Sequence, residues 1–467
     1  MEAEQWDAIV VGAGQAGPTL AVRLAKEGRR TLLVERAPQL GGTCVNNGCT
    51  PTKTLVASAR VAHMARRAAD FGVRIDSPVA IDYARVHARM QGIVQQSRDS
   101  LAKWIASTEG LTLVHGHARF VSADTVAVGD RLMRAPQIFL NVGCRPTVPD
   151  WARDAGVPYL TSESLLALKT LPSHLVIVGG GYVGLEFAQI FARLGSQVTV
   201  AERADRLLAR EDDEAAKVVR EALEADGVKF ESSASCFGLK PASEPGHASL
   251  TFRRSGADHT VSASHVLLAL GREPNTDDLG LETTGVQRDD KGFVQVDGQL
   301  RTNVPGIWAM GDVNGRGAFT HTSWNDHEIV VANLLDGEDR SIDGRVPPYA
   351  LYVDPPLARM GDSEHQARAR GTSVLVGMMP MTRVGRARER SETRGFMKVL
   401  VDATSMQLLG ATFVCADADE IIHSLINAKA GGVDVRTLAR TVAIHPTISE
   451  LIPTMLQQLK PLPALKT

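Results

Sequence analysis

The feature that most restricts the fold of this chain is a glycine-rich turn that occurs twice. The first copy is GAGQAG at residues 12–17, and the second is GGGYVG at residues 179–184. Each copy follows a short apolar run and precedes an amphipathic segment, and each leads to a second apolar run that ends in an acid, Glu35 or Glu202. This order predicts strand, turn, helix and strand, the βαβ unit that binds a dinucleotide. Two copies predict two dinucleotide sites in an α/β chain.

Each residue of the fingerprint has a physical role. Gly12 permits the tight turn, Gly14 lets the backbone approach a pyrophosphate, and Gly17 allows the helix to pack closely on the strand. Glu35 is placed to accept a hydrogen bond from a ribose hydroxyl. A glycine triplet alone is weak evidence and could be a turn that binds nothing, but the flanking strand, helix and acid make it specific. The fingerprint residues of the second copy are Gly179, Gly181, Gly184 and Glu202.

A pair of cysteines, Cys44 and Cys49, is separated by four residues and followed by Lys53. Cys49 precedes a helix-compatible run, so we expect it at a helix N-terminus, where partial positive charge stabilises a thiolate. We expect Cys44 in a loop, from which it can reach back to form a reversible disulfide. The alternatives are two structural thiols or half of a zinc site. A zinc site usually needs a second Cys/His pair, and the other cysteines, Cys144, Cys236 and Cys415, are scattered singly.

Two dinucleotide sites and a cysteine pair in one chain indicate electron transfer between two bound dinucleotides and a disulfide. The length of 467 residues suggests roughly three domains. The net charge of −2 gives no indication of nucleic acid or an anionic membrane as a partner. We find no apolar run long enough to span a bilayer and no signal peptide, and we expect a cytoplasmic protein.

The patterns divide the chain into segments 1–150, 151–270, 271–340 and 341–467. The last segment has no nucleotide fingerprint and is predicted to be an α+β domain. It contains HPTISE at residues 445–450, where Glu450 is expected about one turn along a helix that starts at Pro446. Glu450 could orient the imidazole of His445, although a lone histidine is more often structural.

Together these motifs resemble the flavoprotein disulfide reductases, the class I pyridine nucleotide–disulfide oxidoreductases. Members include dihydrolipoamide dehydrogenase, glutathione reductase, mycothione reductase and mercuric reductase. The resemblance covers nearly the whole chain. It implies two Rossmann-like dinucleotide-binding domains and a C-terminal α+β dimerisation domain. Segments 1–150 and 271–340 would form the FAD domain, 151–270 the NAD(P) domain and 341–467 the interface of an obligate homodimer.

The resemblance also implies roles for single residues. Cys44 and Cys49 would form the redox disulfide, and His445 with Glu450 would act on the cysteines of the neighbouring subunit. Lys53 would approach flavin N5 and pair with Glu186; the alternative is a surface lysine and an ordinary buried glutamate. Further cofactor contacts are expected at Gly42, Thr43, Ala118, Gly143, Gly271, Asp312 and Thr320.

Two of the implied cofactor contacts have plain structural alternatives. Tyr182 would cover the nicotinamide pocket, but it could equally be a packing residue at a helix N-terminus. Asp312 would hold a ribityl hydroxyl of the flavin, and its alternative is a helix cap.

The sequence says less about the substrate than about the fold and the cofactor sites. The last residues, 460–467, contain no cysteine, unlike mercuric reductase and the cysteine-tailed thioredoxin reductases, although residues 50–55 and 319–323 look like the mercuric-reductase-like branch. Asn47, between the two cysteines, replaces an aliphatic residue common in relatives; it marks a different substrate pocket or is neutral. We predict NAD(P)H-dependent reduction of a small organic disulfide. The alternatives are dihydrolipoamide dehydrogenase, a metal-ion or quinone reductase, and a non-catalytic redox sensor.

Coenzyme choice depends on the end of the second fingerprint. Glu202 favours NADH because a carboxylate there bonds the ribose and repels a 2′-phosphate. Arg203 and Arg206 could instead grip a 2′-phosphate. The prediction is FAD together with NADH or NADPH, with a lean to NADH.

Overall fold

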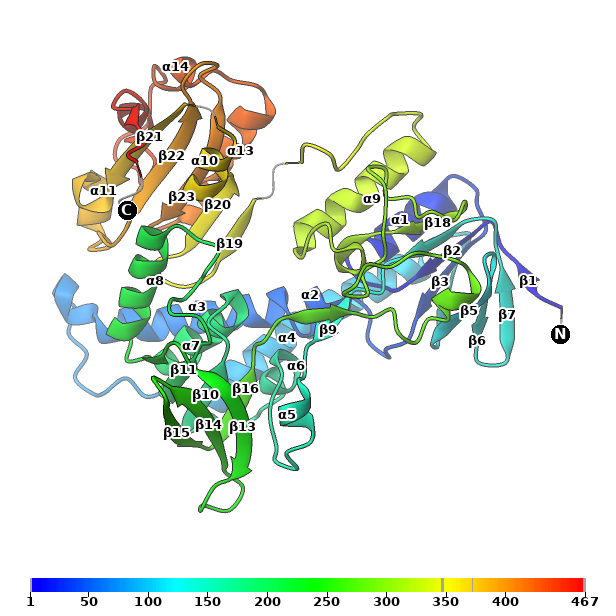
Figure 1. Ribbon diagram of the computed structural model, residues 1–467, viewed down its shortest axis with the longest axis horizontal. Helices are drawn as coiled ribbons and strands as arrows, with labels where there is room; N and C mark the ends of the chain where they lie inside the picture. Colours follow the sequence, from blue (N-terminus) through cyan, green and yellow to red (C-terminus); the bar gives the residue numbers. More distant parts are fainter. Residues whose placement is uncertain (1, 346–347, 372, 465–467) are drawn as a thin grey trace.

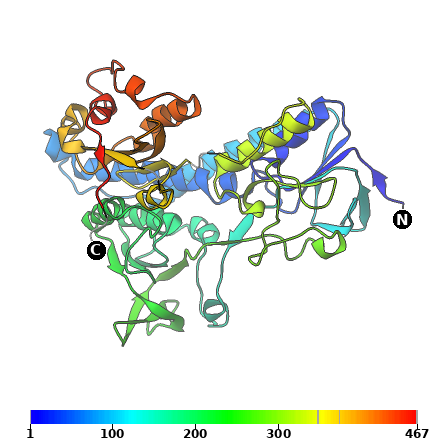
Figure 2. The same cartoon turned by 45° about the horizontal axis from the view of Figure 1, so that its top comes forward.

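The computed structural model describes residues 2–345, 348–371 and 373–464. The ranges predicted above also include residues 1, 346, 347, 372 and 465–467, which lie outside the described residues. Three domains are visible, and the two ends of the chain lie at opposite sides of the molecule (Figures 1 and 2).

The first domain is built on a five-stranded parallel sheet. In spatial order its strands are β18 (Ile307–Ala309), β8 (Ile138–Leu140), β2 (Ala8–Val11), β3 (Thr31–Glu35) and β4 (Leu111–His115). Helices α1 (Gly17–Lys26) and α9 (Thr320–Leu334) cover one face. The other face packs on a small sheet of β1 (Glu4–Gln5), β7 (Arg131–Arg134), β6 (Thr125–Val128) and β5 (Ala118–Ser122).

The alternation of side chains along β2 explains this layering. Ala8 and Val10 pack in the cluster that holds α1 and α9, whereas Ile9 and Val11 pack in the cluster that holds β5 and β6. All four side chains are buried. A strand covered on both faces reads as a continuous apolar run, which is how it appears in the sequence.

The second domain repeats the parallel arrangement with four strands in the order β12-β11-β10-β16. These are β12 (Lys229–Glu231), β11 (Gln197–Ala201), β10 (His174–Val178) and β16 (His265–Leu268). Helices α7 (Tyr182–Leu194) and α8 (Asp213–Ala225) follow β10 and β11, and an antiparallel sheet of β13 (Ser235–Pro241), β14 (Ala248–Arg254) and β15 (Ala257–Ala263) is inserted before β16. The strands that enter and leave this domain, β9 (Cys144–Pro146) and β17 (Arg272–Pro274), pair with each other.

The C-terminal domain contains a six-stranded antiparallel sheet in the order β19-β20-β23-β22-β21-β24. Its strands are β19 (Tyr349–Leu351), β20 (Leu357–Gly361), β21 (Val374–Pro380), β22 (Phe396–Asp402), β23 (Leu408–Val414) and β24 (Lys460–Pro461). Short helices pack on it, among them α10 (Glu364–Ala369), α13 (His423–Ala430) and α15 (Ile452–Leu456).

Two long helices connect the first domain with the second. They are α3 (Cys49–Arg66) and α4 (Tyr83–Ala106), which lie side by side in Figure 1. Leu55 and Ala59 of α3 pack in one core cluster with Phe187 and Phe191 of α7. This contact fixes the start of α3, and therefore Cys49, against the second domain.

Two local predictions were wrong. Cys44 was expected in a loop but lies in the short helix α2 (Gly42–Asn46). Gly41 and Gly42 adopt left-handed φ values of 103° and 57°, and Asn46 Nδ2 donates to the Leu40 and Gly42 carbonyls, which closes the turn locally.

The other error concerns Glu450, which was expected in a helix from Pro446. Residues 448–451 instead form turns, and the helix begins only at Ile452. Pro453 in the first turn of α15 marks this later start, because proline is tolerated where no backbone donor is needed. Separately, none of the described helices has both the length and the hydropathy needed to cross a bilayer.

A buried lysine joins the second and C-terminal domains. Lys398 on β22 is 2% exposed, and its Nζ lies 2.7 Å from Asp212 Oδ2 and 3.0 Å from Glu364 Oε1, with Glu214 as a third partner. The three carboxylates are close enough together to hold a cation, and the lysine ammonium supplies that charge.

We therefore expect Lys398→Met to destabilise the protein by roughly 3 kcal/mol, because it leaves the buried Asp212 carboxylate and two partly exposed ones without their counter-charge. The measurement is the shift in apparent thermal or urea unfolding. Lys217→Met on α8 is the control, because Lys217 is 75% exposed and should change stability by less than ~0.5 kcal/mol. Equal small effects for the two variants would contradict this account.

Candidate active site

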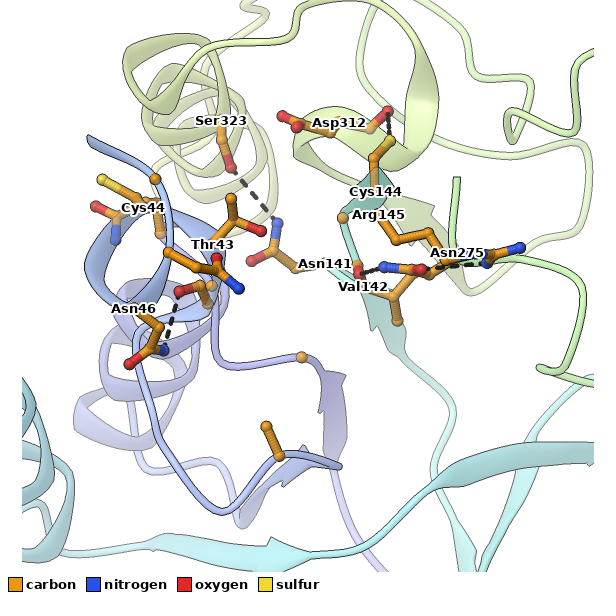
Figure 3. A pocket seen from close by; sticks show the side chains of 18 of the residues that line it. Thr43, Cys44, Asn46, Asn141, Val142, Cys144, Arg145, Asn275, Asp312 and Ser323 are labelled. Atoms are coloured by element: carbon orange, nitrogen blue, oxygen red, sulfur yellow. Dashed lines mark hydrogen bonds between the residues drawn. The ribbon is translucent and has the colours of Figure 1, made fainter. Parts of the chain in front are cut away.

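A cavity of about 660 Å³ lies at the carboxyl ends of the strands of the first domain. It extends from Glu35 past the cysteine pair to Val183 and Phe187 on α7. Figure 3 shows its centre, with Thr43 and Cys44 on one side, Asp312 on the other and Asn141 between them.

The glycine turn forms one wall of this cavity, and it leaves no space for side chains. A Cβ on Gly12 would lie 2.3 Å from the Asn141 carbonyl oxygen, and one on Gly42 would lie 2.8 Å from Gly14 Cα. A Cβ on Gly17 would lie 2.0 Å from the Gly12 carbonyl oxygen, so Gly17 serves helix–strand packing, as predicted. The exposed backbone and the start of α1 form a cradle that fits a pyrophosphate.

Glu35 closes this turn from the end of β3. Its Oε2 accepts from the Ala13 backbone N–H at 2.7 Å, and its Oε1 accepts from the Ala37 N–H at 2.8 Å. The carboxylate lines the cavity, so it is fixed where a ribose hydroxyl would reach it.

Asn141, directly after β8, joins two walls of the cavity through its side-chain amide, a role that the sequence did not predict. Its Oδ1 accepts from the Gly17 N–H at 3.0 Å, and its Nδ2 donates to the Met310 carbonyl at 3.0 Å. It therefore ties the glycine turn to the strand before Asp312. Figure 3 shows a further bond, from its Nδ2 to Ser323 Oγ on α9. A polar residue at the end of a buried apolar strand was the available signal.

Asp312 points a carboxylate into the cavity. Its side chain makes no hydrogen bond to another described residue, and burial raises its pKa against the opposing effect of Arg272. Arg272 also lines the cavity, and its Nη2 donates to Thr43 Oγ1 at 3.2 Å. A half-buried carboxylate that no other described residue bonds can accept from a bound molecule, and the ribityl chain of FAD offers hydroxyls. The residues present therefore fit the flavin that the sequence implies.

The two cysteines lie together in this cavity, both as free thiols. The two thiols are near enough to shift each other's pKa. Cys49 is the first residue of α3, and its Sγ lies 3.2 Å from Thr320 Oγ1 at the start of α9. The hydrogen bond from Cys44, aided by Thr320 and Lys53, lowers the pKa of Cys49 to about 6, and the same bond raises the pKa of Cys44. The reduced pair is therefore a thiolate on Cys49 and a thiol on Cys44.

Lys53 and Glu186 form the predicted pair. Lys53 Nζ lies 2.7 Å from Glu186 Oε2, and the Glu186 side chain is 6% exposed. The other oxygen, Oε1, accepts from the backbone N–H of Tyr352 at 2.9 Å. Lys53 Nζ also lies 4.6 Å from the centre of the Tyr352 ring, a cation–π contact that the sequence did not indicate.

The remaining cysteines differ from the pair. Cys144 also lines the cavity, but burial raises its pKa to about 12, and it donates to the Asp312 carbonyl. Burial likewise raises the pKa of Cys415. Cys236 is exposed on β13, away from the cavity.

The second glycine turn repeats the first. A Cβ on Gly179 would lie 2.3 Å from the Ala269 carbonyl oxygen, and one on Gly184 would lie 2.2 Å from the Gly179 carbonyl oxygen. Glu202 Oε2 accepts from the Gly180 N–H at 2.6 Å, and Oε1 accepts from the Ala204 N–H at 2.8 Å. The acid therefore has the same geometry as Glu35 in the first turn.

The two arginines near Glu202 differ in how far their guanidinium groups are bonded within the chain. Arg206 donates to the Glu211 and Ala209 carbonyls and pairs with Asp213, so its guanidinium is already in use. Arg203 is exposed.

Tyr182, which was expected to cover the nicotinamide pocket, does not line the cavity, and its hydroxyl bonds Glu211. Its hydroxyl donates to Glu211 Oε1 at 2.6 Å, and the cavity wall is formed by its neighbour Val183.

The predicted histidine lies on the surface of the C-terminal domain. His445 is 79% exposed, and its Nδ1 lies 2.7 Å from Glu450 Oε2, whose side chain is 10% exposed. Glu450 therefore orients the imidazole, although it does so from a turn and not from a helix.

The predicted residues fall into two groups. Those that line the cavity described above are Gly12, Gly14, Glu35, Gly42, Thr43, Cys44, Cys49, Lys53, Ala118, Gly143, Glu186, Asp312 and Thr320. Those outside its wall are Gly17, Gly179, Gly181, Tyr182, Gly184, Glu202, Arg203, Gly271, His445 and Glu450.

Comparison with known proteins agrees with this site. Residues 6–326 match the family described as "Pyridine nucleotide-disulphide oxidoreductase", and residues 347–456 match its dimerisation domain. The chain is 34% identical to the probable pyridine nucleotide-disulfide oxidoreductase RclA of Escherichia coli over 96% of this chain and 97% of that protein. It is 32% identical to a dihydrolipoyl dehydrogenase of Bacillus subtilis over 95% and 96% of the two chains.

A mercuric reductase of Streptomyces lividans is 34% identical over 96% of this chain and 94% of that protein. A solved structure, the HOCl-induced flavoprotein disulfide reductase RclA from E. coli, superposes with a TM-score of 0.86 at 33% identity, covering 97% of this chain and all of that one. With two Rossmann-like domains, a dimerisation domain and a paired-cysteine cavity, this chain belongs to the class I pyridine nucleotide–disulfide oxidoreductases, flavoprotein enzymes that use FAD and a pyridine nucleotide.

Proposed function

We propose that this enzyme uses NADH or NADPH to reduce the disulfide of a small organic thiol, through FAD and a Cys44–Cys49 redox disulfide. The observation that carries the proposal is the pair of cysteines, Cys44 and Cys49, that line one cavity together with Lys53, Cys49 being at the start of α3 and in contact with Thr320. Bound FAD supplies the carrier that passes two electrons from the coenzyme to this pair. Lys53, held by Glu186, places a positive charge beside Cys49.

The pKa order assigns different roles to the two sulfurs. Cys44 holds the proton of the reduced pair, so a base must remove it before Cys44 attacks a substrate disulfide. That attack forms a mixed disulfide and releases one substrate thiol, which takes up the proton. The Cys49 thiolate then attacks the Cys44 sulfur of the mixed disulfide, which forms the Cys44–Cys49 disulfide and releases the second substrate sulfur as a thiolate, which takes a proton from solvent.

We assign the base to His445 of the partner subunit, oriented by Glu450. The match to the dimerisation domain supports a homodimer. On the isolated chain His445 stands beside two exposed apolar residues, Val442 at 98% and Ile444 at 79% exposure. Apolar side chains next to a histidine oriented by a carboxylate favour a surface that another subunit covers. A shared active site is therefore part of the proposal, as is a cytoplasmic location.

We also propose that the enzyme prefers NADH to NADPH. It is supported by Glu202, whose carboxylate is fixed at the second turn, and by Arg206, whose guanidinium is already bonded within the chain. Arg203, which is exposed, could still bind a 2′-phosphate.

A second candidate function is the reduction of a metal ion. A thiol–thiolate pair is a soft ligand set, and relatives include a mercuric reductase and an RclA structure described as a Cu(II) complex. Dihydrolipoamide dehydrogenase activity is the other alternative, because relatives carry that name.

The proposal predicts the outcome of a substrate panel with purified holoenzyme. We expect NADH-driven turnover of at least one low-molecular-weight disulfide, at a higher kcat/KM than with Hg(II) or Cu(II). Oxidation of NADH and release of thiol would be followed together, with NADPH, dihydrolipoamide and NAD, and quinone as further arms. Faster reduction of a metal ion than of every disulfide would transfer the assignment to the second candidate.

The cysteine roles predict the behaviour of single variants. Cys44→Ser and Cys49→Ser should each lower disulfide turnover at least roughly a thousandfold, as removal of a nucleophile does. Single-turnover reduction of the flavin by NAD(P)H should persist in both, because the coenzyme does not need the sulfurs. Cys144→Ser is the matched control, since its high pKa keeps that cavity thiol protonated, and its turnover should stay within about twofold of wild type. Full disulfide turnover in either of the first two variants would refute the mechanism.

The thiolate on Cys49 predicts a pH dependence. Its pKa is lowered, so the thiolate should be present above pH about 6 and lost as the pH falls through that value. Ultraviolet thiolate absorption of the reduced protein would measure the midpoint. Cys44→Ala should move it upward toward the ordinary cysteine value of about 8.5, because the Cys44 hydrogen bond is the main cause of the shift. Cys144→Ala should leave it unchanged. A wild-type midpoint near the ordinary value would contradict the pairing.

A further inference from the structure

A tyrosine of the C-terminal domain contacts both members of the Lys53–Glu186 pair. The Tyr352 ring lies over the ammonium of Lys53, with 4.6 Å between Nζ and the ring centre. The backbone N–H of the same residue donates to Glu186 Oε1 at 2.9 Å. The reaction proposed above uses neither contact, because there Glu186 alone holds Lys53. A third residue, from another domain, therefore takes part in the surroundings of this ion pair.

The segment that carries Tyr352 is held against helix α7 by polar contacts. The Asp354 backbone N–H donates to Gln189 Oε1 at 2.7 Å, and Gln189 Nε2 donates back to the Asp354 carbonyl at 3.1 Å. Arg193 Nη1 lies 2.7 Å from Asp354 Oδ2. Gln189 and Arg193 are 4% and 6% exposed, so these bonds are shielded from water and strengthened. The backbone next to the Tyr352 ring is therefore fixed along one face of α7.

Lys53 needs more than one contact to keep a fixed position. Its ammonium ends a flexible four-carbon stem, and the side chain is 32% exposed. An ion pair with Glu186 restricts the distance between the two charges but leaves the stem free to rotate. The face of an aromatic ring attracts the ammonium from a second direction, because that face carries partial negative charge. The two contacts together hold the ammonium near Cys49, where its charge favours the thiolate.

The ring of Tyr352 is neutral, so the ring face and not a phenolate attracts the lysine. Burial raises the pKa of the phenol. The acidic groups around it raise this pKa further: Asp419, Glu186, Cys49 and Glu420. The phenol therefore keeps its proton throughout the pH range in which Cys49 titrates, and its attraction for the ammonium is constant over that range.

We propose that Tyr352 is a positioning residue for the redox pair: its ring holds the Lys53 ammonium beside Cys49, and it does so from the C-terminal domain. The inference rests on the proposed function, because the redox role of Cys49 is part of that proposal. The domain that matches the dimerisation family thus contributes to the charge next to the thiolate of its own chain. The alternative is a ring that only fills space, with Lys53 held by Glu186 alone.

The first test is the titration of the Cys49 thiolate in holoenzyme with reduced thiols, without coenzyme or substrate. Ultraviolet thiolate absorption gives the midpoint, with the double variant Cys44→Ser and Cys49→Ser as the baseline. Tyr352→Leu removes the ring face and should raise the midpoint by about half a pH unit, which is about a threefold fall in the ratio of thiolate to thiol. Tyr352→Phe keeps the ring face and should leave the midpoint unchanged. Cys44, Thr320 and Glu186, which also act on this thiolate, are present in both variants.

The second test keeps the shape of the ring, so it remains available if Tyr352→Leu fails to fold. Phenylalanine with an increasing number of fluorine atoms, placed at position 352, weakens the attraction of the ring face for a cation step by step. The midpoint of Cys49 should rise with each step. In the Lys53→Met background the same series should be flat, because the ammonium is gone. A flat series with Lys53 present overturns the proposal.

The matched control is Tyr159→Leu, because Tyr159 is half-buried like Tyr352 but packs in the core of the second domain. Its midpoint should equal that of wild type. An unchanged midpoint in folded Tyr352→Leu, or an equal rise in Tyr352→Phe or Tyr159→Leu, overturns the positioning role. A wild-type enzyme that turns over no disulfide overturns the proposed function instead, and the titration still tests the contact between ring and lysine.

Discussion

The carboxylate of Glu186 is the contact on which the site depends, because it joins all three domains. One oxygen pairs with Lys53 of α3, and the other accepts from the Tyr352 N–H of the C-terminal domain, while Glu186 itself belongs to the second domain. A buried carboxylate of this kind must keep its partners, since each unpaired charge costs several kcal/mol, on the order of 3–5. The pair thus fixes the start of α3 relative to α7, and with it the distance between Cys49 and the cavity wall that α7 forms.

The two glycine turns were predictable because they are local. Each is encoded within about two dozen residues, and in both the terminal acid bonds the second residue of the turn, Glu35 to Ala13 and Glu202 to Gly180. The apolar strands were equally predictable, because a parallel strand that is covered on both faces has a continuous run of apolar residues and no alternation of apolar and polar ones. The pairing of Lys53 with Glu186 came from the family resemblance alone, whereas the cysteine pair and the orientation of His445 by Glu450 were also predicted from spacing. The structure places Lys53 against Glu186 and His445 against Glu450.

The contacts that the sequence did not predict join residues that are far apart in the chain. Asn141 bonds residues more than a hundred positions away, Tyr349 meets Glu211 across two domains, and Tyr352 completes the environment of Lys53. No periodicity or spacing encodes such contacts, because they follow from the packing of domains. The errors in local structure have a different origin. Around Cys44 the backbone depends on two left-handed glycines and the Asn46 side chain, and near Glu450 the position of Pro453 decides where the helix starts.

The unequal surroundings of the two sulfurs explain how one pair performs two steps. Cys49 is held at the N-terminus of an 18-residue helix and contacted by Thr320, so its charge is stabilised where it stands. Cys44 sits in a helix of five residues and keeps its proton through the bond to Cys49. In the proposed mechanism, a fixed thiolate suits the sulfur that closes the disulfide, whereas a protonated sulfur on a short segment suits the one that attacks a substrate. The proton on Cys44 would then make a base from the partner subunit a condition of turnover, which would tie the proposed chemistry to the dimer.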